Sequence, residues 1–241
     1  MKIHLIWGST CTGKTELAIE LSKSTGWPVI ALDRVQCCFD IATGSGRPHP
    51  EELQSTRRIY LDNRPISEGL ISAEEANDRL KLEVSKYAGE GGGILEGGSI
   101  SLINLIFRDP YWCDGFRWSL HRVRWQDPDL FMEKAKARVR RMLVSSTETP
   151  GLLDELVAAE SDPNAKRAVQ DIDGYRYAMG YAEARDLSIA QLLERMNDEM
   201  KEDLVNGIAL EYFEHATWQE RDFPAVPEEW IVEQKLEKFV G

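Results

Sequence analysis

The sequence predicts an α/β fold, in which a parallel β-sheet with flanking helices is followed by a helical C-terminal region. Three observations support this prediction. Residues 8–15, GSTCTGKT, form a glycine-rich loop between a short apolar run and a segment with helical spacing. Short apolar runs then alternate with helical patterns up to about residue 125, as in folds whose strands pair in parallel. From residue 129 to about residue 219, nearly every segment has helical spacing.

The first three elements are expected to form a βαβ unit. Residues 2–7 (KIHLIW) and 27–32 (WPVIAL) are apolar runs of strand length, and residues 14–24 between them have helical spacing. The two strands of such a unit are parallel, so both end at the same edge of the sheet. We therefore expect the glycine-rich loop and Asp33, which follows the second strand, to meet at the edge where ligands bind in such sheets.

The later elements continue this alternation before the chain becomes helical. In order, we expect a loop at residues 42–52, a strand at 55–61, a helix at 73–87, a strand at 93–99, a helix at 99–107 and a strand at 116–125. No long linker follows, so residues 1–125 and 126–241 should form an α/β core and a mainly helical part of one compact unit. We expect the proline-punctuated residues 223–241 to pack across the surface or to fray.

Composition and charge restrict the class of protein. The chain has 29 Lys and Arg against 41 Asp and Glu, a formal net charge of −12, so no nucleic acid polymer is expected as a partner. No apolar run approaches the ~20 residues of a membrane span, and no signal peptide is recognised. The four cysteines form no CxxC pair and are expected to be reduced. We expect a cytoplasmic protein without a membrane partner; the oligomeric state stays open, and a monomer is compatible with the sequence.

The segment GSTCTGKT matches the GxxxxGKT pattern of a P-loop. Gly8 and Gly13 let the backbone turn so that N–H groups point inward at phosphate oxygens, and the following helix adds its positive end. Lys14 supplies a mobile positive charge, and the Thr15 hydroxyl can ligate a Mg²⁺ ion that bridges phosphate oxygens. Residues 1–125 are therefore predicted to be a P-loop NTPase-like core that binds a nucleotide or a diphosphate, with the helical part completing the substrate channel.

Two charged side chains outside the P-loop are candidates for the site. A carboxylate such as Asp33 beside a phosphate site is unfavourable unless it binds metal or takes a proton, although a helix-capping or surface role is equally open. Arg138 is spaced with Phe131, Ala135 and Met142, which should place its guanidinium on a buried face. A bidentate phosphate contact would satisfy it, and snorkelling along the helix end is the alternative.

Two more helical stripes carry polar side chains. The first consists of Val169, Asp173, Arg176 and Gly180. Its carboxylate and guanidinium should both face inward, where they can also pair with each other. The second stripe consists of Val205, Ile208, Tyr212 and His215. A lone histidine in such a position is more often a satisfied core residue than a functional one.

Eight segments, in the same order along residues 1–224, resemble the bacterial adenylate isopentenyltransferases, the cytokinin-making prenyltransferases of plant-associated bacteria. They are GSTCTGKT, ALDRVQCC, ATGSGRP, QSTRRIYLDNRP, LEGGSIS, AKARVRRML, DIDGYRYA and EYFEHA. LDRVQCC and ATGSGRP, with the run RPISEG, are far more specific than the P-loop. The chain departs from the family at Ser9, where the loop often has proline, and after Pro224, where nothing matches.

The resemblance implies transfer of a dimethylallyl group from dimethylallyl diphosphate to N6 of AMP, with release of pyrophosphate. The amine attacks well only as a base removes its proton, and Asp33 fits that base. The loop amides, Lys14, Arg138 and a Mg²⁺ ion on Thr15 fit the stabilisation of the leaving diphosphate. The family pattern places Thr10 at the reacting end, as a further catalytic residue.

The resemblance also implies a set of substrate-binding residues. They are Gly8, Cys11, Thr12, Gly13, Thr15, Arg34, Thr43, Ser45, Arg47, Asp173, Arg176, Tyr212 and His215. The loop that contains Thr43, Ser45 and Arg47 should contact the ribose or phosphate of AMP, and Arg176 and Tyr212 should lie near the diphosphate. Asp173 and His215 should line the prenyl pocket. Because that pocket would be partly polar, a hydroxylated prenyl diphosphate is also an expected donor.

Three alternatives stay open on the sequence. A tRNA dimethylallyltransferase shares the P-loop and Asp33, but usually has a longer chain with an inserted helical domain. A P-loop small-molecule kinase would normally have an aspartate at the end of a later strand, where this chain has Glu96. A non-catalytic P-loop protein would leave Asp33 and Arg138 without a purpose. The sequence does not determine the preferred acceptor among AMP, ADP and ATP, or whether the enzyme acts in a bacterium or in a plant cell.

Overall fold

A computed structural model describes residues 1–146 and 149–231 of the chain. Its five-stranded sheet has the order β3-β2-β4-β1-β5, and every neighbouring pair is parallel. The strands are β1 (Lys2–Gly8), β2 (Val29–Leu32), β3 (Arg58–Ile59), β4 (Gly92–Gly97) and β5 (Arg117–Val123). Each lies within or overlaps a predicted strand, although β3 contains only two residues of the seven expected. The predicted α/β fold with a parallel sheet is confirmed.

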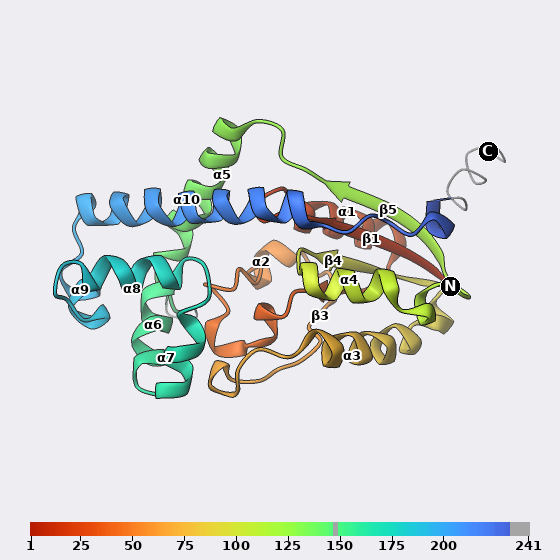
Figure 1. Cartoon of the computed structure of the whole chain (residues 1–241), viewed down its shortest axis with the longest axis horizontal. Helices are drawn as coiled ribbons and strands as arrows, with labels where there is room; N and C mark the ends of the chain where they lie inside the picture. Colours follow the sequence, from red (N-terminus) through yellow and green to blue (C-terminus); the bar gives the residue numbers. More distant parts are fainter. Residues whose placement is uncertain (147–148, 232–241) are drawn as a thin grey trace.

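Helices cover both faces of the sheet (Figure 1). They are α1 (Lys14–Thr25), α3 (Ala73–Lys86) and α4 (Ile100–Arg108), and the short α2 (Pro50–Leu53) lies in the segment between β2 and β3. In β1, Ile6 packs with Ala18 of α1, whereas Leu5 packs in a separate cluster with Leu80 of α3 and Leu102 of α4. Alternate residues of a strand point to opposite faces, so this division shows that α1 lies on one face and α3 with α4 on the other.

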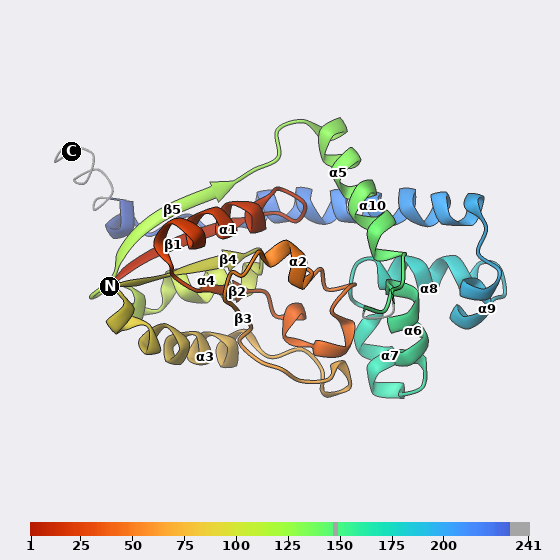
Figure 2. The ribbon, with the colours of Figure 1, turned by 180° about the vertical axis from the view of Figure 1, so that it is seen from behind.

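The chain after β5 is helical, as predicted. Its helices are α5 (Pro128–Met142), α6 (Leu152–Glu160), α7 (Pro163–Val169), α8 (Tyr175–Glu183), α9 (Ile189–Glu194) and α10 (Asp198–Asp222). Helices α6 to α9 build a second apolar core around Leu156 and Tyr175. The long helix α10 runs from this core back along the sheet, which both views show clearly (Figures 1 and 2).

One predicted stripe is wrong. The spacing of Val169, Asp173 and Arg176 assumed one continuous helix, but α7 ends at Val169 and α8 begins at Tyr175. Gly174 between them has φ of 88°, a left-handed conformation that interrupts the helical period. The buried residues of α8 are therefore Tyr175, Ala178, Tyr181 and Ala182, and the Arg176 side chain is 54% exposed.

The segment that follows α10 packs against the sheet. The Trp230 side chain is buried and stacks on Trp118 of β5, with the ring centroids 3.8 Å apart. The Trp230 ring also lies 5.2 Å from that of Phe107 in α4. The expectation of surface packing is thus confirmed as far as residue 231, and the rest of the predicted segment lies outside the described residues. No helix of the described residues is long and apolar enough to cross a bilayer.

Candidate active site

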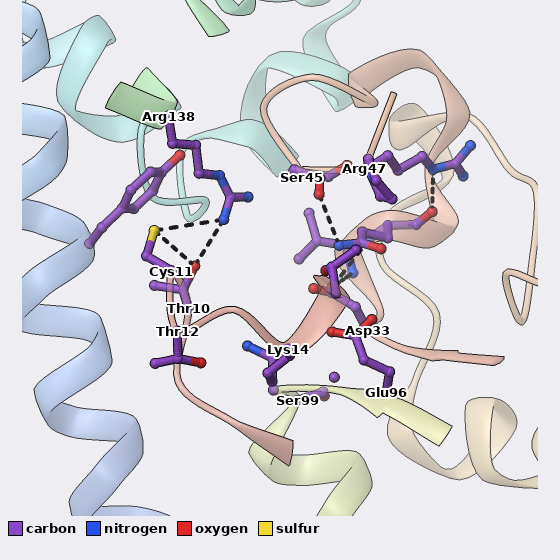
Figure 3. A pocket seen from close by; sticks show the side chains of 18 of the residues that line it. Thr10, Cys11, Thr12, Lys14, Asp33, Ser45, Arg47, Glu96, Ser99 and Arg138 are labelled. Atoms are coloured by element: carbon purple, nitrogen blue, oxygen red, sulfur yellow. Dashed lines mark hydrogen bonds between the residues drawn. The ribbon is translucent and has the colours of Figure 1, made fainter. Parts of the chain in front are cut away.

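A cavity of about 1790 Å³ opens at the carboxyl ends of the strands. Its walls come from the P-loop (residues 8–15), the ends of β2 and β4, the 43–47 loop, α5 and α10. Figure 3 shows side chains from these elements converging on one space. The expectation that the P-loop and Asp33 share one edge of the sheet is confirmed, because both line this cavity.

The P-loop is shaped by backbone conformations and by its own hydrogen bonds. Gly13 and Cys11 have φ of 90° and 58°, so the chain turns through the left-handed region twice before α1 begins. Lys14 Nζ and the Thr12 hydroxyl both donate to the carbonyl of Ser9, at 2.5 and 2.8 Å. All of the predicted loop residues except Gly8 line the cavity: Thr10, Cys11, Thr12, Gly13, Lys14 and Thr15.

Gly8 has a packing role rather than the predicted position in the cavity wall. A Cβ atom on this residue would lie 1.9 Å from the carbonyl oxygen of Val123, at the end of β5. Only glycine allows that close approach of two backbones. Gly8 therefore sets where the P-loop leaves the sheet, and it acts on the site through the loop's geometry.

Gln219 of α10 anchors the P-loop, a role that no pattern in the sequence indicated. Its side-chain oxygen accepts from the Thr10 amide at 3.0 Å, and its side-chain nitrogen donates to the Gly98 carbonyl at 2.9 Å. Gly98 follows β4, so one buried amide ties the P-loop to the neighbouring strand end. A nearby contact, from the Ser9 hydroxyl to Glu220 Oε1 at 3.2 Å, reinforces the link to α10.

Arg138 of α5 projects its guanidinium into the cavity, as predicted. Nη1 donates to the Thr10 hydroxyl at 3.3 Å and to Cys11 Sγ at 3.7 Å (Figure 3). The guanidinium carbon also lies 5.7 Å from the ring centroid of the buried Tyr212. The buried face of α5 nevertheless consists of Phe131, Ala135, Val139 and Met142, and Arg138 lies at its margin. This position lets the side chain contact the P-loop while α5 packs on α10.

Asp33 follows β2 and one of its carboxylate oxygens is held by the backbone. Oδ1 accepts from the amides of Val35 and Gln36 at 2.9 and 3.3 Å, and no hydrogen bond from the described residues reaches Oδ2. Burial raises the pKa of Asp33, and the charge of Glu96 adds to that rise, while the two amides and Lys14 oppose it. Burial lowers the pKa of Lys14, whereas the negative charges of Glu96 and Asp33 raise it. A carboxylate with a raised pKa and one free oxygen suits proton abstraction.

Glu96 forms a buried ion pair beneath the cavity. Its carboxylate lies 2.7 Å from Nη2 of Arg58, and both side chains are almost fully buried. Glu96 is the penultimate residue of β4 and Arg58 begins β3, so the pair links two strands that are separated by β2. Both residues line the cavity beside Lys14 and Asp33. Arg58 was missed from the sequence, because nothing in STRRIYL distinguishes it from Arg57, whose side chain is half exposed.

The 43–47 loop forms the opposite wall of the cavity. Thr43, Ser45 and Arg47 all line it, as predicted. Arg47 itself is held away from the P-loop, because Nε donates to the Gln36 carbonyl at 2.6 Å and the guanidinium lies 4.1 Å from the ring centroid of Tyr60. Arg34 also lines the cavity, and its Nη1 donates to the carbonyl of Ile71 at 2.9 Å.

Asp173 and His215 meet at another part of the cavity. His215 Nδ1 lies 2.7 Å from Asp173 Oδ2, and both residues line the cavity with Trp218. Arg176 does not line it. Its guanidinium contacts Asp173 Oδ1 at 2.6 Å and Glu211 Oε1 at 2.8 Å, outside the cavity wall. The predicted inward-facing guanidinium is therefore wrong, because the break before α8 turns Arg176 outward, although its expected pairing with Asp173 is confirmed.

A family model for isopentenyl transferase matches residues 1–234. The chain belongs to the isopentenyl transferase family. The adenylate dimethylallyltransferase of Pseudomonas savastanoi is 78% identical over 234 residues, which cover 97% of this chain and 99% of that protein. The adenylate dimethylallyltransferase of Rhizobium rhizogenes is 52% identical over 229 residues, which cover 95% of this chain and 94% of that protein. The family predicted from the sequence motifs is confirmed.

Two solved structures share the fold of this isopentenyl transferase. A tRNA isopentenylpyrophosphate transferase from Staphylococcus epidermidis matches with a TM-score of 0.67 at 15% identity, covering 99% of this chain and 98% of that one. One from Bacillus halodurans matches with a TM-score of 0.66 at 16% identity, covering 90% and 86% of the two chains. These likenesses concern the fold, which is P-loop NTPase-like as predicted.

The isopentenyl transferase site has oxygen donors suited to a phosphate-bound Mg²⁺ ion. Thr15 lies in the first turn of α1 and lines the cavity, with the carboxylates of Asp33 and Glu96 also in its wall. That arrangement fits Mg²⁺ in phosphate sites, which is typically held by one or two protein oxygens together with substrate phosphates and water.

Proposed function

We propose that this isopentenyl transferase moves the dimethylallyl group of dimethylallyl diphosphate to N6 of AMP and releases pyrophosphate, as a step of cytokinin synthesis. One observation supports this assignment above all: the P-loop, Arg138 and Asp33 line one cavity. The first two are cationic or donor-rich, and the third is a carboxylate suited to act as a base. A diphosphate leaving group needs cations and hydrogen-bond donors, and an amine nucleophile needs a base.

The proposed reaction forms the bond between N6 and C1 of the prenyl group as the bond between C1 and the diphosphate oxygen breaks. The bonding electron pair leaves with pyrophosphate. The proton of N6 passes to Asp33. The amine lone pair is delocalised into the adenine ring, so N6 attacks well only as this proton is removed. Oδ2 of Asp33 is the oxygen that receives it, since Oδ1 already accepts two backbone hydrogen bonds.

The leaving diphosphate acquires negative charge that the P-loop and its neighbours can stabilise. Lys14 and Arg138 supply two positive charges, and Thr10 and the loop amides supply further donors. In the structure Lys14 donates to the Ser9 carbonyl, and Arg138 donates to the Thr10 hydroxyl. A bound diphosphate would replace those contacts with stronger, charge-assisted hydrogen bonds. When bound, Mg²⁺ held by Thr15 would neutralise part of the same charge.

AMP is the proposed acceptor, and the 43–47 loop is its proposed binding wall. Thr43 and Ser45 would contact the ribose or the phosphate, with Asp33 beneath the adenine amine. The relatives named adenylate dimethylallyltransferase match this chain over nearly their whole length, which favours the nucleotide over tRNA as the acceptor. The net charge of −12 also disfavours a polyanion, so we propose a cytoplasmic enzyme without a nucleic acid partner. Retention of tRNA at low salt would contradict that proposal.

A hydroxylated prenyl diphosphate is a second proposed donor. Asp173 and His215 are 2.7 Å apart in the cavity wall, and together they provide both an acceptor and a donor for a hydroxyl group. A buried hydroxyl is accepted only where such partners exist. Replacing both residues with leucine should lower kcat/KM for the hydroxylated donor more than for dimethylallyl diphosphate. An unchanged ratio of the two values would exclude this role.

The main experiment incubates the enzyme with dimethylallyl diphosphate, Mg²⁺ and each of AMP, ADP and ATP, and follows N6-prenylated product by mass. We expect product with AMP, dependence on Mg²⁺, and stoichiometric pyrophosphate. A folded enzyme that makes no product with any of the three nucleotides would contradict the proposed function. Near-full turnover by Asp33→Ala would contradict only the proposed base.

A further inference from the structure

Glu155 of α6 is a buried carboxylate that holds the backbone of the 43–47 loop. Its Oε1 accepts from the Thr43 amide at 2.7 Å, and its Oε2 accepts from the Gly44 amide at 2.8 Å and from the Tyr175 hydroxyl. Only 2% of Glu155 is exposed, and it does not line the large cavity. It therefore lies behind the wall that faces the substrates, with its two oxygens on consecutive amides of that wall.

The 43–47 loop depends on this carboxylate. The loop belongs to no strand or α-helix, and a buried backbone amide without a partner is costly. The Thr43 hydroxyl donates to the Pro150 carbonyl at 2.7 Å, which ties the loop to the residue just before Gly151 and α6. A Cβ atom on Gly44 would lie 2.0 Å from the Tyr175 ring, so the loop is also fitted closely against α8.

The same loop reaches Arg138, one of the two proposed catalytic cations. A Cβ atom on Gly46 would lie 1.6 Å from Nη2 of Arg138, so loop and guanidinium are in direct contact. The position of the loop thus affects both the surface that would meet the nucleotide and the side chain that contacts Thr10. A shift of about 1 Å in such a wall is enough to lower activity considerably.

We propose that Glu155 is a positioning residue for the acceptor nucleotide, which acts by fixing the 43–47 loop through the amides of Thr43 and Gly44. The proposal rests on the proposed function for its substrate, but its structural part concerns the loop alone. Glu155 touches no substrate.

Replacing Glu155 with glutamine tests the contact with the loop amides directly. Glutamine keeps the shape of the side chain but replaces one acceptor oxygen with an NH₂ group. Tyr175 can rotate its hydroxyl to accept a hydrogen bond, whereas a backbone amide can only donate. Whichever way the glutamine is turned, its NH₂ group therefore meets the amide of Thr43 or of Gly44, and one loop amide loses its partner.

The test compares Glu155→Gln with wild type and with Glu160→Gln. Glu160 lies on the same helix and pairs with Lys166 at 3.5 Å, away from the cavity. We expect Glu155→Gln to raise KM for AMP about tenfold and to change KM for dimethylallyl diphosphate by less than about twofold. Hydrogen–deuterium exchange of a peptide that spans residues 43–47 should be faster than in wild type. Glu160→Gln should match wild type in all three measurements.

Three results would overturn the proposal. One is unchanged exchange of the 43–47 peptide in a folded Glu155→Gln enzyme, and another is an equal rise of both KM values. Tyr175→Phe leaves both loop amides on the carboxylate, so a rise in KM for AMP as large as that of Glu155→Gln would also contradict the assignment. The exchange measurement needs no turnover. It therefore tests the loop contact even where wild-type enzyme makes no product, an outcome that would refute the proposed function instead.

Discussion

Arg138 and Thr10 are 128 residues apart in the sequence, and the Arg138 guanidinium lies 3.3 Å from the Thr10 hydroxyl. The contact joins α5 of the helical part to the P-loop of the sheet. It places a second positive charge opposite Lys14 across the space where a diphosphate would lie (Figure 3). In the proposed reaction, the P-loop would bind the diphosphate, and the helical part would add positive charge that favours its departure.

Replacing Arg138 with lysine should lower kcat more than it changes either KM. Lysine keeps the charge but cannot donate in two directions from a planar group, so the transition state loses hydrogen bonds. We expect a loss of about 100-fold or more in kcat, measured by steady-state assay of prenylated AMP. Arg167→Lys on the exposed face of α7 is the control and should have no effect. A kcat of Arg138→Lys within about threefold of wild type would contradict the role.

Replacing Asp33 with asparagine should abolish the proposed base while retaining the shape of the side chain. We expect kcat to fall by about 10²- to 10⁴-fold with both substrates still bound. In wild type, burial raises the pKa of Asp33, and only the ionised form takes a proton. Activity should therefore be lost as pH falls through that raised pKa, at a higher pH than the ~3.9 of a free aspartate.

The pH profile also provides the check on this prediction. The acidic limb of kcat/KM should be present in wild type and in Asp129→Asn, an exposed control at the start of α5. It should be absent from the residual activity of Asp33→Asn. Persistence of the same limb in that variant would assign it to another group.

Replacing Trp230 with alanine should destabilise the fold rather than the chemistry. The side chain is fully buried and stacked on Trp118, so its removal leaves a cavity beside the sheet. We expect the free energy of unfolding to fall by about 3–5 kcal/mol, measured by urea denaturation. Ile231→Ala at the neighbouring, exposed position should cost less than about 1 kcal/mol. Equal losses in the two variants would show that the stacking does not anchor this segment.

Glu155 should give the free energy of unfolding a specific pH dependence. Burial raises its pKa to about 7, against the hydrogen bonds from Tyr175 and the loop amides, whereas an unfolded glutamate titrates near 4.5. Between those values the folded state binds more protons, so this group's contribution to stability decreases as pH rises from about 4.5 to 7. The total decrease is roughly 3 kcal/mol relative to a side chain that does not titrate.

The measurement is the difference in unfolding free energy between wild type and Glu155→Gln from pH 4.5 to 8. Wild type should lose stability relative to the variant as pH rises. Among the described residues, Tyr175 on α8 donates to Glu155, and Asp40 and Asp162 line a small pocket with it. Subtraction of the variant removes the contributions that these groups make in both proteins. A constant difference, or one of opposite sign, would contradict the raised pKa.

Much of the fold could be predicted because the apolar runs, the helical spacing and the P-loop all indicate the same α/β architecture. Short apolar runs that alternate with helical spacing are sufficient to predict a parallel sheet, and the P-loop between a strand and a helix locates the ligand edge. Asp33 could be added because parallel strands end together. The error at Arg176 arose where a spacing rule was extended across a break that Gly174 introduces.

The sequence by itself determined the P-loop, the parallel sheet and, through its motifs, the family, because these depend on local patterns of residues. Only the tertiary structure decided which distant side chains support them. Gln219 lies 121 residues from Gly98, one of its two partners, and Arg58 lies 38 residues from Glu96. No periodicity in the sequence predicts such pairs. Their partners are chosen by how α10 and β3 pack, since a buried polar group must be satisfied by whatever packing brings within reach.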